Sequence, residues 1–421
     1  MAVTVKTPSV KAAPLDVARI RKDFPILAQT VRGKPLVYLD NAATSQKPRA
    51  VLEAMQRVFE EHNANIHRGV YEFSERTTAA FEEARAKVAR FLNAPSEREV
   101  IFVRNATEGV NLVAYAWGRD NIARGDRIVT TVLEHHSDFV PWQQLAGEVG
   151  AHVVMIDVDE EGRLRRDQLS AELRRGARLL AITHTSNGLG TVNPIKEIAA
   201  EAHAAGATVL VDAAQAVPHT PVDVQDLGAD FLVFSGHKML APPGSGAVWG
   251  REALLEKMRP FLYGGDMISR VTLARTEWNE LPWKFEAGTS SYVDAIGLGA
   301  AIDYLTEVGM RRIHDHELSL VAYLLPRLEE IPGVAIYGPR TLDDRVGVVS
   351  FNIGGVHPHD AATIFDREGV CVRAGHHCNQ PLMARLGVAA TTRASMYLYN
   401  TTGECDALIG AVHAAKKVFG V

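Results

Sequence analysis

The chain has 421 residues, of which 47% are hydrophobic and 23% charged, with a formal net charge of −5 at pH 7. This composition is typical of a globular protein, and the length exceeds the usual size of a single core, so we expect two domains. The slight acidity argues against nucleic acid as a partner, and no apolar run is long enough to span a bilayer.

The first residues, 1–14, are small and polar and lack the apolar core of a secretory signal, so we expect a loose tail. The three cysteines, Cys371, Cys378 and Cys405, have no C-x-x-C pair and no even set of spacings, which argues against a disulfide framework or a zinc ribbon. Few cysteines without an export signal indicate the cytoplasm.

Strand patterns alternate with helical segments from about residue 50 to residue 255, which predicts a doubly wound, mostly parallel sheet of the α/β class. The stretch 263–286 has no helical periodicity, and a hairpin is expected there. Residues 293–330 indicate long helices that lead into a smaller α+β domain, with strands at 346–351 and 370–372.

Two successive strands end in groups of opposite charge. The strand 207–212 ends in Asp212, and the strand 230–234 is followed by Lys238. If the strands are parallel neighbours, both side chains open into one crevice. A lysine past the end of a buried strand is placed to form a Schiff base with a carbonyl cofactor. Asp212 could pair with the pyridinium nitrogen of pyridoxal phosphate, or it could cap a helix.

Polar groups also follow two further strands. The strand 127–132 leads to His135, whose imidazole could stack on a flat ring, and the strand 179–184 leads to Asn187, whose amide could bond a cofactor or substrate oxygen. A lone histidine at a strand end is more often structural. Four polar groups at the same end of four strands nevertheless favour a binding site.

A phosphate site is expected beside these groups. Thr107 lies at the start of an apolar helix after the strand 100–103, where a helix N-terminus supplies N–H donors. Together with Ser235 and His237 it would form a phosphate cup, while helix capping by Asn105 or Thr107 is the simpler explanation. The sequence has no nucleotide phosphate loop.

The chain resembles the group II, Suf-type cysteine desulfurases, which are fold-type-I pyridoxal phosphate enzymes of the class V aminotransferase superfamily. The resemblance runs over nearly the whole length and rests on specific motifs. These are N-I-H-R-G at 65–69, E-H-H at 134–136, V-D-A-A-Q at 211–215, S-G-H-K at 235–238 and R-A-G-H-H-C at 373–378.

The resemblance implies a set of residues that hold pyridoxal 5′-phosphate. Lys238 carries the cofactor, Asp212 meets its ring nitrogen, and His135 stacks on its ring. By the same resemblance, Gln215 bonds the phenolic oxygen, and Asn187 is a further cofactor-binding residue. Thr107, Ser235 and His237 hold the phosphate, which Thr289 reaches from the second subunit of a homodimer.

The substrate groups are implied in the same way. Arg393 matches the family's carboxylate-binding arginine, assisted by Asn187, and Arg373 and His67 match positions that line the site. His135 is a candidate general acid and base, because an imidazole titrates near working pH.

Cys378 is the candidate nucleophile. It lies in a polar loop, expected to be mobile, among histidines that would stabilise its thiolate, and it matches the cysteine that receives sulfur in the family. Cys371 is expected in a buried strand as an inert thiol, and Cys405 in the polar start of the last helix.

The implied reaction converts L-cysteine to L-alanine, with a persulfide on Cys378 that supplies sulfur for iron–sulfur cluster assembly. The nearest alternative is a selenocysteine lyase acting on L-selenocysteine, which would depend less on the loop thiol. An aminotransferase of the same superfamily and a catalytically dead scaffold homologue are the more distant alternatives.

The stretch 356–360 resembles the family branch that passes sulfur to a small, zinc-containing, SufU-like acceptor protein of the Suf system. There His359 would exchange as a ligand on the acceptor's zinc. Alternatively His359 caps the helix beginning near Asp360, and the sequence does not separate the two. Neither this stretch nor His376-His377 has the spacing of a closed structural zinc site, so no resident metal is expected.

These expectations combine into one architecture. Residues 1–30 form a tail and the first helix of the small domain, 31–295 a large cofactor-binding domain around a mostly parallel seven-stranded sheet, and 296–421 a small α+β domain.

Overall fold

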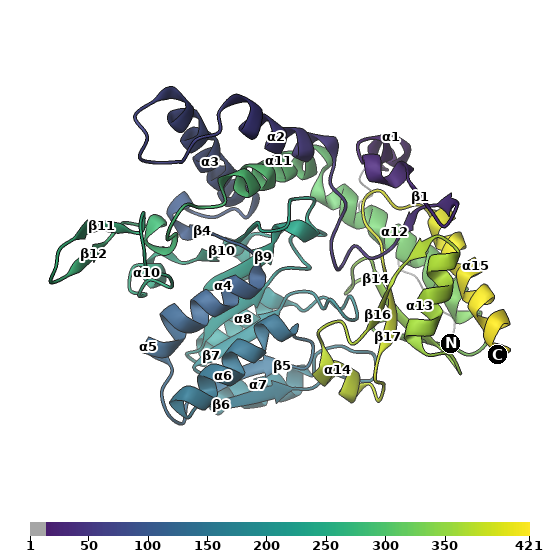
Figure 1. The fold of residues 1–421 in the computed structure, drawn as a ribbon. Coiled ribbons are helices and arrows are strands. Elements are labelled where there is room, and N and C mark those ends of the chain that lie inside the picture. Colours follow the sequence, from purple (N-terminus) through teal and green to yellow (C-terminus); the bar gives the residue numbers. More distant parts are fainter. Residues whose placement is uncertain (1–13) are drawn as a thin grey trace.

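The structure is a computed structural model that describes residues 14–421 (Figure 1). At its centre lies a seven-stranded sheet in the order β4-β10-β9-β8-β7-β5-β6. Its strands are β4 (Val100–Val103), β5 (Arg127–Thr131), β6 (His152–Ile156), β7 (Leu179–Thr183), β8 (Thr208–Asp212), β9 (Phe231–Ser235) and β10 (Gly246–Gly250). All pair in parallel except β10, which is antiparallel to β4 and β9, so the expected α/β sheet is confirmed.

The sheet is buried on both faces. In β8, Val209 and Val211 belong to one apolar cluster and Leu210 to another, because successive strand residues point to opposite faces. Apolar residues on both faces explain why these strands appear in the sequence as continuous apolar runs rather than alternating ones. The covering helices are α4 (Ala106–Val113) and α6 (Val140–Val149) on one face, and α3 (Glu72–Phe91), α7 (Arg166–Arg174) and α8 (Ile195–Ala204) on the other.

The C-terminal part of the chain forms a second, smaller α+β unit, seen on the right of Figure 1. Its antiparallel sheet has the order β13-β14-β17-β16 and packs against three helices through a separate apolar cluster. These elements are α12 (Met310–Glu329), β13 (Val334–Tyr337), β14 (Val348–Ile353), α13 (Pro358–Arg367), β16 (Arg373–Gly375), β17 (Thr391–Ser395) and α15 (Thr402–Phe419). The expected smaller α+β part is therefore present.

The N-terminal segment is shared between the two parts. Helix α1 (Val17–Lys22) contributes Ile20 to the cluster that covers the large sheet. Strand β3 (Val37–Tyr38), in contrast, pairs in parallel with β15 (Val370–Cys371) of the C-terminal part. The expected N-terminal tail falls mostly at residues 1–13, outside the described residues.

Helix α11 (Tyr292–Val308) spans the expected domain boundary at 295/296. It packs against α2 (Arg49–Glu61) and α3, and its Leu298 and Ala301 belong to the core of the large sheet. The helix therefore belongs with the large part, and the chain passes to the smaller part at Gly309, which has a φ of +93°.

The expected hairpin is formed by β11 (Ile268–Val271) and β12 (Thr276–Trp278) and projects from the molecule (Figure 1). Its tip is exposed, including the apolar side chains of Val271 and Leu273. The remaining short elements are β1 (Thr30–Val31), β2 (Lys34–Pro35), α5 (Arg119–Asn121), α9 (Val224–Leu227), α10 (Glu252–Leu255) and α14 (Gln380–Arg385). Among residues 14–421, no helix has the length and hydropathy that crossing a bilayer requires.

Candidate active site

A cavity of about 250 Å³ lies at the carboxyl ends of the parallel strands, as expected for an open α/β sheet. Residues from both parts of the molecule line it. The predicted residues that the fold brings together there are Thr107, His135, Asn187, Asp212, Ser235, His237, Lys238, Arg373, Cys378 and Arg393.

Lys238 lies in the short helical turn Gly236–Lys238 directly after β9. Burial lowers the pKa of Lys238, and the charge of Asp212 opposes that shift. A desolvated amine loses its proton more readily and becomes a better nucleophile and base. The position and the electrostatics of Lys238 thus both suit covalent attachment of a carbonyl compound.

Asp212 ends β8, the strand next to β9. It is 4% exposed, and its Oδ1 accepts a hydrogen bond from the Ala214 backbone N–H at 2.9 Å. Burial raises the pKa of Asp212, and the Lys238 ammonium lowers it. Asp212 therefore caps a turn rather than a helix. A cation that enters the cavity would pair with this buried carboxyl group.

His135 follows β5 with its ring in the cavity lining. Its Nδ1 accepts a hydrogen bond from the Ser137 backbone N–H at 3.1 Å, so the neutral ring has its proton on Nε2. Burial lowers the pKa of His135 to about 3, helped by the positive charges of Lys238, His136 and Arg393. The prediction that this imidazole titrates near working pH is wrong for this site, because a buried ring beside cations stays neutral.

The predicted phosphate cup assembles around the start of α4. Asn105 is the N-cap, since its side chain accepts from the Glu108 backbone N–H. The Ser235 Oγ accepts from the Ala106 N–H at 2.9 Å, which joins β9 to this helix start. The Thr107 hydroxyl lies beside them in the lining. Hydroxyls around a helix N-terminus form an anion site.

Ser137 was missed by the sequence analysis. It lines the cavity, and its hydroxyl bonds the Thr107 hydroxyl at 2.5 Å and the His135 Nδ1 at 2.9 Å. It thereby links Thr107, of the predicted phosphate site, to His135. The only signal in the sequence was a small polar residue two positions after His135, which is a very common arrangement.

Two arginines enter the cavity from the smaller sheet, and Asp40 holds both. Arg373 bonds Asp40 through Nε and Nη2 at 3.2 and 3.0 Å, and the Nη2 of Arg393 lies 3.4 Å from Asp40 Oδ1. Arg393 is 2% exposed and also donates to the backbone oxygen of Asn187 at 2.8 Å. Burial lowers the pKa of Arg393 to about 10, which leaves it charged. Asp40 was not singled out from the sequence.

Cys378 lies in the loop between β16 and α14, with its sulfur in the same cavity lining as Lys238. His377 and Cys378 have φ of +53° and +57°, a conformation that non-glycine residues rarely adopt. The loop is anchored rather than loose. The Cys378 oxygen accepts from the His136 N–H at 2.8 Å, and the Asn379 amide donates to the Leu133 and Glu134 oxygens.

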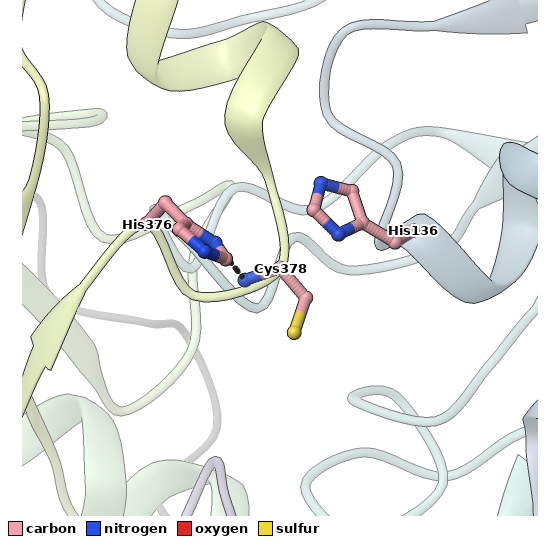
Figure 2. Close-up of side chains that lie close together, drawn as sticks. All are labelled: His136, His376 and Cys378. Atoms are coloured by element: carbon pink, nitrogen blue, oxygen red, sulfur yellow. Dashed lines mark hydrogen bonds between the residues drawn. The ribbon is translucent and has the colours of Figure 1, made fainter.

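Two imidazoles flank the Cys378 thiol (Figure 2), and one nitrogen of each lies within 4.8 Å of the sulfur and of the other. The His376 Nδ1 accepts from the Cys378 N–H, and the His136 Nε2 accepts from the Gln380 N–H, both at 3.1 Å. The other nitrogen of each neutral ring must then carry the proton. These rings can donate to a thiolate but could bind a metal only by losing a backbone hydrogen bond, so we assign no metal ligands.

The other two thiols are unsuited to nucleophilic attack. Cys405 is fully buried in α15, contrary to the expected polar setting, and burial raises its pKa to about 12. Cys371 is half-buried, and burial raises its pKa as well. A thiol with a raised pKa gives little thiolate at neutral pH.

Three predicted residues lie outside the cavity lining. Gln215 is buried with its Nε2 donating to the Ala42 oxygen at 2.7 Å. His67 contacts Glu82 through Nε2 at 3.0 Å, beside Trp283. Thr289 lines a separate cavity of about 400 Å³. The roles of these three residues stay predictions.

The chain belongs to the class V aminotransferase family: the family model described as "Aminotransferase class-V" matches residues 37–408. It is 50% identical over 401 residues to a probable cysteine desulfurase of Halalkalibacterium halodurans, covering 95% of this chain and 98% of that protein. It is 47% identical over 419 residues to a cysteine desulfurase of Haloferax volcanii, covering 96% and 98% respectively.

Solved structures agree with these relatives. The apo structure of a cysteine desulfurase from Thermococcus onnurineus matches with a TM-score of 0.91 at 40% identity, covering 98% of this chain and 100% of that one. The cysteine desulfurase CsdA of Escherichia coli, in an S-sulfonic acid form, matches with a TM-score of 0.89 at 37% identity, covering 96% and 99%. The expected fold-type-I architecture is confirmed.

Enzymes of this family depend on pyridoxal 5′-phosphate, and the residues of the cavity fit that group. Lys238 supplies an amine with a lowered pKa, and Asp212 a buried carboxyl for a ring cation. The start of α4 with Thr107 and Ser235 supplies donors for a phosphate.

Proposed function

We propose that this protein is a pyridoxal 5′-phosphate-dependent cysteine desulfurase that moves the sulfur of L-cysteine onto Cys378 and releases L-alanine. The observation that supports this most directly is that the Cys378 thiol lines the same cavity as Lys238 and Arg393. A plain aminotransferase has no need of a thiol there. The similarity to named cysteine desulfurases over nearly the whole chain points the same way.

Substrate binding follows from the two arginines. An amino acid carboxylate is best held by a guanidinium fork, and Arg393 presents one that is buried and fixed by Asn187 and Asp40. Arg373, on the more exposed side, shares Asp40 and adds a second positive charge. Binding at Arg393 would place the substrate between Lys238 and Cys378.

The bound cofactor supplies an electron sink for the substrate's Cα. Lys238, with its lowered pKa, removes the Cα proton and can return a proton to the substrate carbon skeleton. The Cys378 thiolate attacks the substrate sulfur, so an S–S bond forms while the C–S bond breaks. The Cβ that loses sulfur gains a proton, which completes alanine and leaves a persulfide on Cys378. His136 and His376 flank the attacking sulfur, with one nitrogen of each ring within 4.8 Å of it.

The test is to supply L-cysteine to the purified protein and to measure alanine and sulfide together, without a keto acid. Equal amounts of alanine and released or enzyme-bound sulfur are expected. Alanine formation that requires a keto acid would instead identify an aminotransferase, and a colourless, inactive protein a scaffold. Selenocysteine lyase would be favoured if Cys378→Ala kept full turnover of L-selenocysteine and that substrate were preferred before the substitution.

The proposal extends to the biological setting. We place the protein in the Suf-type subgroup, with its sulfur passing to iron–sulfur cluster assembly in the cytoplasm. The motifs R-A-G-H-H-C at 373–378 and N-I-H-R-G at 65–69 support that subgroup by resemblance. We further propose two domains, with residues 31–295 forming most of the large domain and 296–421 most of the small one.

A homodimer is proposed because Thr289 lies outside its own chain's cofactor cavity, beside exposed apolar side chains such as Leu262. Light scattering should show a dimer. Thr289→Val should weaken pyridoxal 5′-phosphate binding by about tenfold, since one phosphate hydrogen bond is lost at a charged group. A fully active monomer would contradict this arrangement.

The acceptor is proposed to be a small zinc-containing protein that docks near His359. The N-cap of α13 is His357, whose side chain accepts from the His359 N–H, so the alternative that His359 caps this helix is wrong. His359 is exposed at the first turn of α13 and is available to a partner.

Replacing His359 by alanine should leave basal sulfide release unchanged and lower stimulation by a zinc-containing acceptor at least about tenfold, since a zinc ligand is lost. His413→Ala, which changes another exposed histidine on α15, is the matched control. Full stimulation of the His359 variant would exclude the histidine from sulfur transfer.

A further inference from the structure

Two carboxyl groups of the turn after β5, those of Glu134 and Asp138, lie buried beside the cavity. Glu134 is 2% exposed and Asp138 0%. Within residues 14–421, neither forms an ion pair with a basic side chain. Burying two ionised carboxylates without a cation is strongly unfavourable, so at least one of them should hold a proton.

The hydrogen bonds of the pair indicate where that proton lies. Glu134 Oε1 accepts from the Thr131 hydroxyl at 2.7 Å, and Asp138 Oδ1 accepts from Trp142 Nε1 at 2.9 Å. The remaining oxygens, Glu134 Oε2 and Asp138 Oδ2, meet no donor group in the described part of the chain. Each carboxyl group nevertheless acts on the pKa of the other as a hydrogen-bond partner, lowering the pKa of Glu134 and raising that of Asp138, so the two groups lie within bonding reach. Two carboxyl groups can bond each other only if one is protonated, and one shared proton would satisfy both remaining oxygens.

We propose that Glu134 and Asp138 form an acid pair that shares one proton and one negative charge, and that this pair positions the cofactor-binding turn. The inference deepens the proposed function and rests on it for the identity of the cofactor. Both are positioning residues, since they act through His135 and Asp212 rather than on the substrate.

The surroundings of the pair favour the protonated form. Burial raises the pKa of Glu134 to about 8 and the pKa of Asp138 well above its ordinary value, and the negative charge of Asp212 adds to both shifts. The hydrogen bonds of the Glu134 carboxyl with the Thr131 hydroxyl and with Asp138 oppose the shift at Glu134. The charge of Lys238 lowers the pKa of Asp212, whereas the groups that shift the pKa of the pair include no cation.

The backbone of the turn that carries the pair bonds both His135 and the Cys378 loop. The Asp138 N–H donates to the His135 oxygen at 2.8 Å, which fixes the residue that stacks on the ring. The Asn379 side-chain amide donates to the Glu134 backbone oxygen at 2.7 Å, which ties the Cys378 loop to this turn. One negative charge behind Asp212 also makes Asp212 a better partner for a ring cation, whereas two would strain the turn by repulsion.

The first test is the pH dependence of apoprotein unfolding, which needs neither turnover nor cofactor. A buried carboxyl with a raised pKa keeps a proton that the unfolded chain releases, so stability falls as pH rises from its ordinary value of 4.5 toward about 8. One such proton changes the unfolding equilibrium constant about tenfold per pH unit. Asp138→Asn replaces the shared proton by a permanent N–H donor and should remove that part of the slope.

Glu134→Gln should also remove that part of the pH slope, because the Gln amide then donates to an ionised Asp138. This variant replaces Asp138→Asn in the experiment if Asp138→Asn does not fold. Equal slopes in the wild-type protein and in the folded variants would overturn the proposal. A failure of desulfurase activity would leave this measurement unchanged, so the two proposals fail separately.

The second test titrates the apoprotein with pyridoxal 5′-phosphate. Either single variant keeps one negative charge, so its affinity for pyridoxal 5′-phosphate should stay within about twofold of the wild type near pH 7. Above pH 8 the wild-type pair loses its shared proton and its affinity should fall, whereas the affinity of each single variant should not change. The double variant Glu134→Gln with Asp138→Asn keeps the bond but removes the charge, and should bind about tenfold more weakly. A tenfold loss in both single variants near pH 7, or no loss in the double variant, would refute the shared charge.

Discussion

Replacing Lys238 with alanine is expected to remove the covalent attachment of the cofactor and to lower desulfurase turnover roughly 10³-fold, because the same amine serves as attachment point and base. The wild-type protein should be yellow and should form a bond to the cofactor that borohydride reduces. The variant should lose both. Visible absorption and mass spectrometry after reduction measure the outcome directly.

Lys284→Met is the matched control for that variant. Lys284 is also buried, with its Nζ donating to the Leu255 backbone oxygen, and burial lowers its pKa, but it lies outside the cavity lining. Its replacement should leave the yellow colour and the reducible bond intact. A reducible bond that survives in the Lys238 variant would move the attachment point elsewhere.

Replacing Cys378 with serine is expected to abolish the persulfide while cofactor and L-cysteine still bind. Serine preserves the backbone of the loop but supplies a hydroxyl, which does not ionise at neutral pH and is a poor nucleophile toward sulfur. Turnover of L-cysteine should fall by at least about 10²-fold. Mass spectrometry of the protein after one exposure to L-cysteine locates the transferred sulfur.

The other thiols serve as controls in the same experiment. Cys371→Ser and Cys405→Ala should retain the persulfide, since burial raises the pKa of both native thiols. Because Cys405 is fully buried, its variant should also be checked for stability. A persulfide mapped to either residue in the wild-type protein would contradict the assignment of Cys378.

The sheet and the edge that bears the site could be predicted because their signals are local. Continuous apolar runs mark strands buried on both faces, and parallel strands align their carboxyl ends, so Asp212 and Lys238 had to meet if β8 and β9 were neighbours. Arg393 has no such signal of its own and was found only through the family resemblance.

The rest depended on contacts that no local pattern encodes. Asp40 meets Arg373 and Arg393 across 333 and 353 positions of chain, and it was visible only after both parts had folded. The pKa of His135 depends on burial and on the charges of three other residues, Lys238, His136 and Arg393, so its residue type alone predicted the wrong protonation behaviour. The acid pair likewise required the structure, since Glu134 and Asp138 look like ordinary polar residues of a turn.

Asp40 lies early in the chain, whereas Arg373 and Arg393, which it bonds, lie near the C-terminal end, and this order has a consequence during protein synthesis. The ribosome releases Asp40 early, and the whole parallel sheet can close once residue 250 has emerged. The two arginines proposed to bind substrate and the proposed nucleophile Cys378 come from β16, β17 and the segment between them, the last strands to be made, so Asp40 meets both arginines only then. A chain that ends before β16 keeps Lys238 and Asp212 but lacks Cys378, so it is expected to form no persulfide.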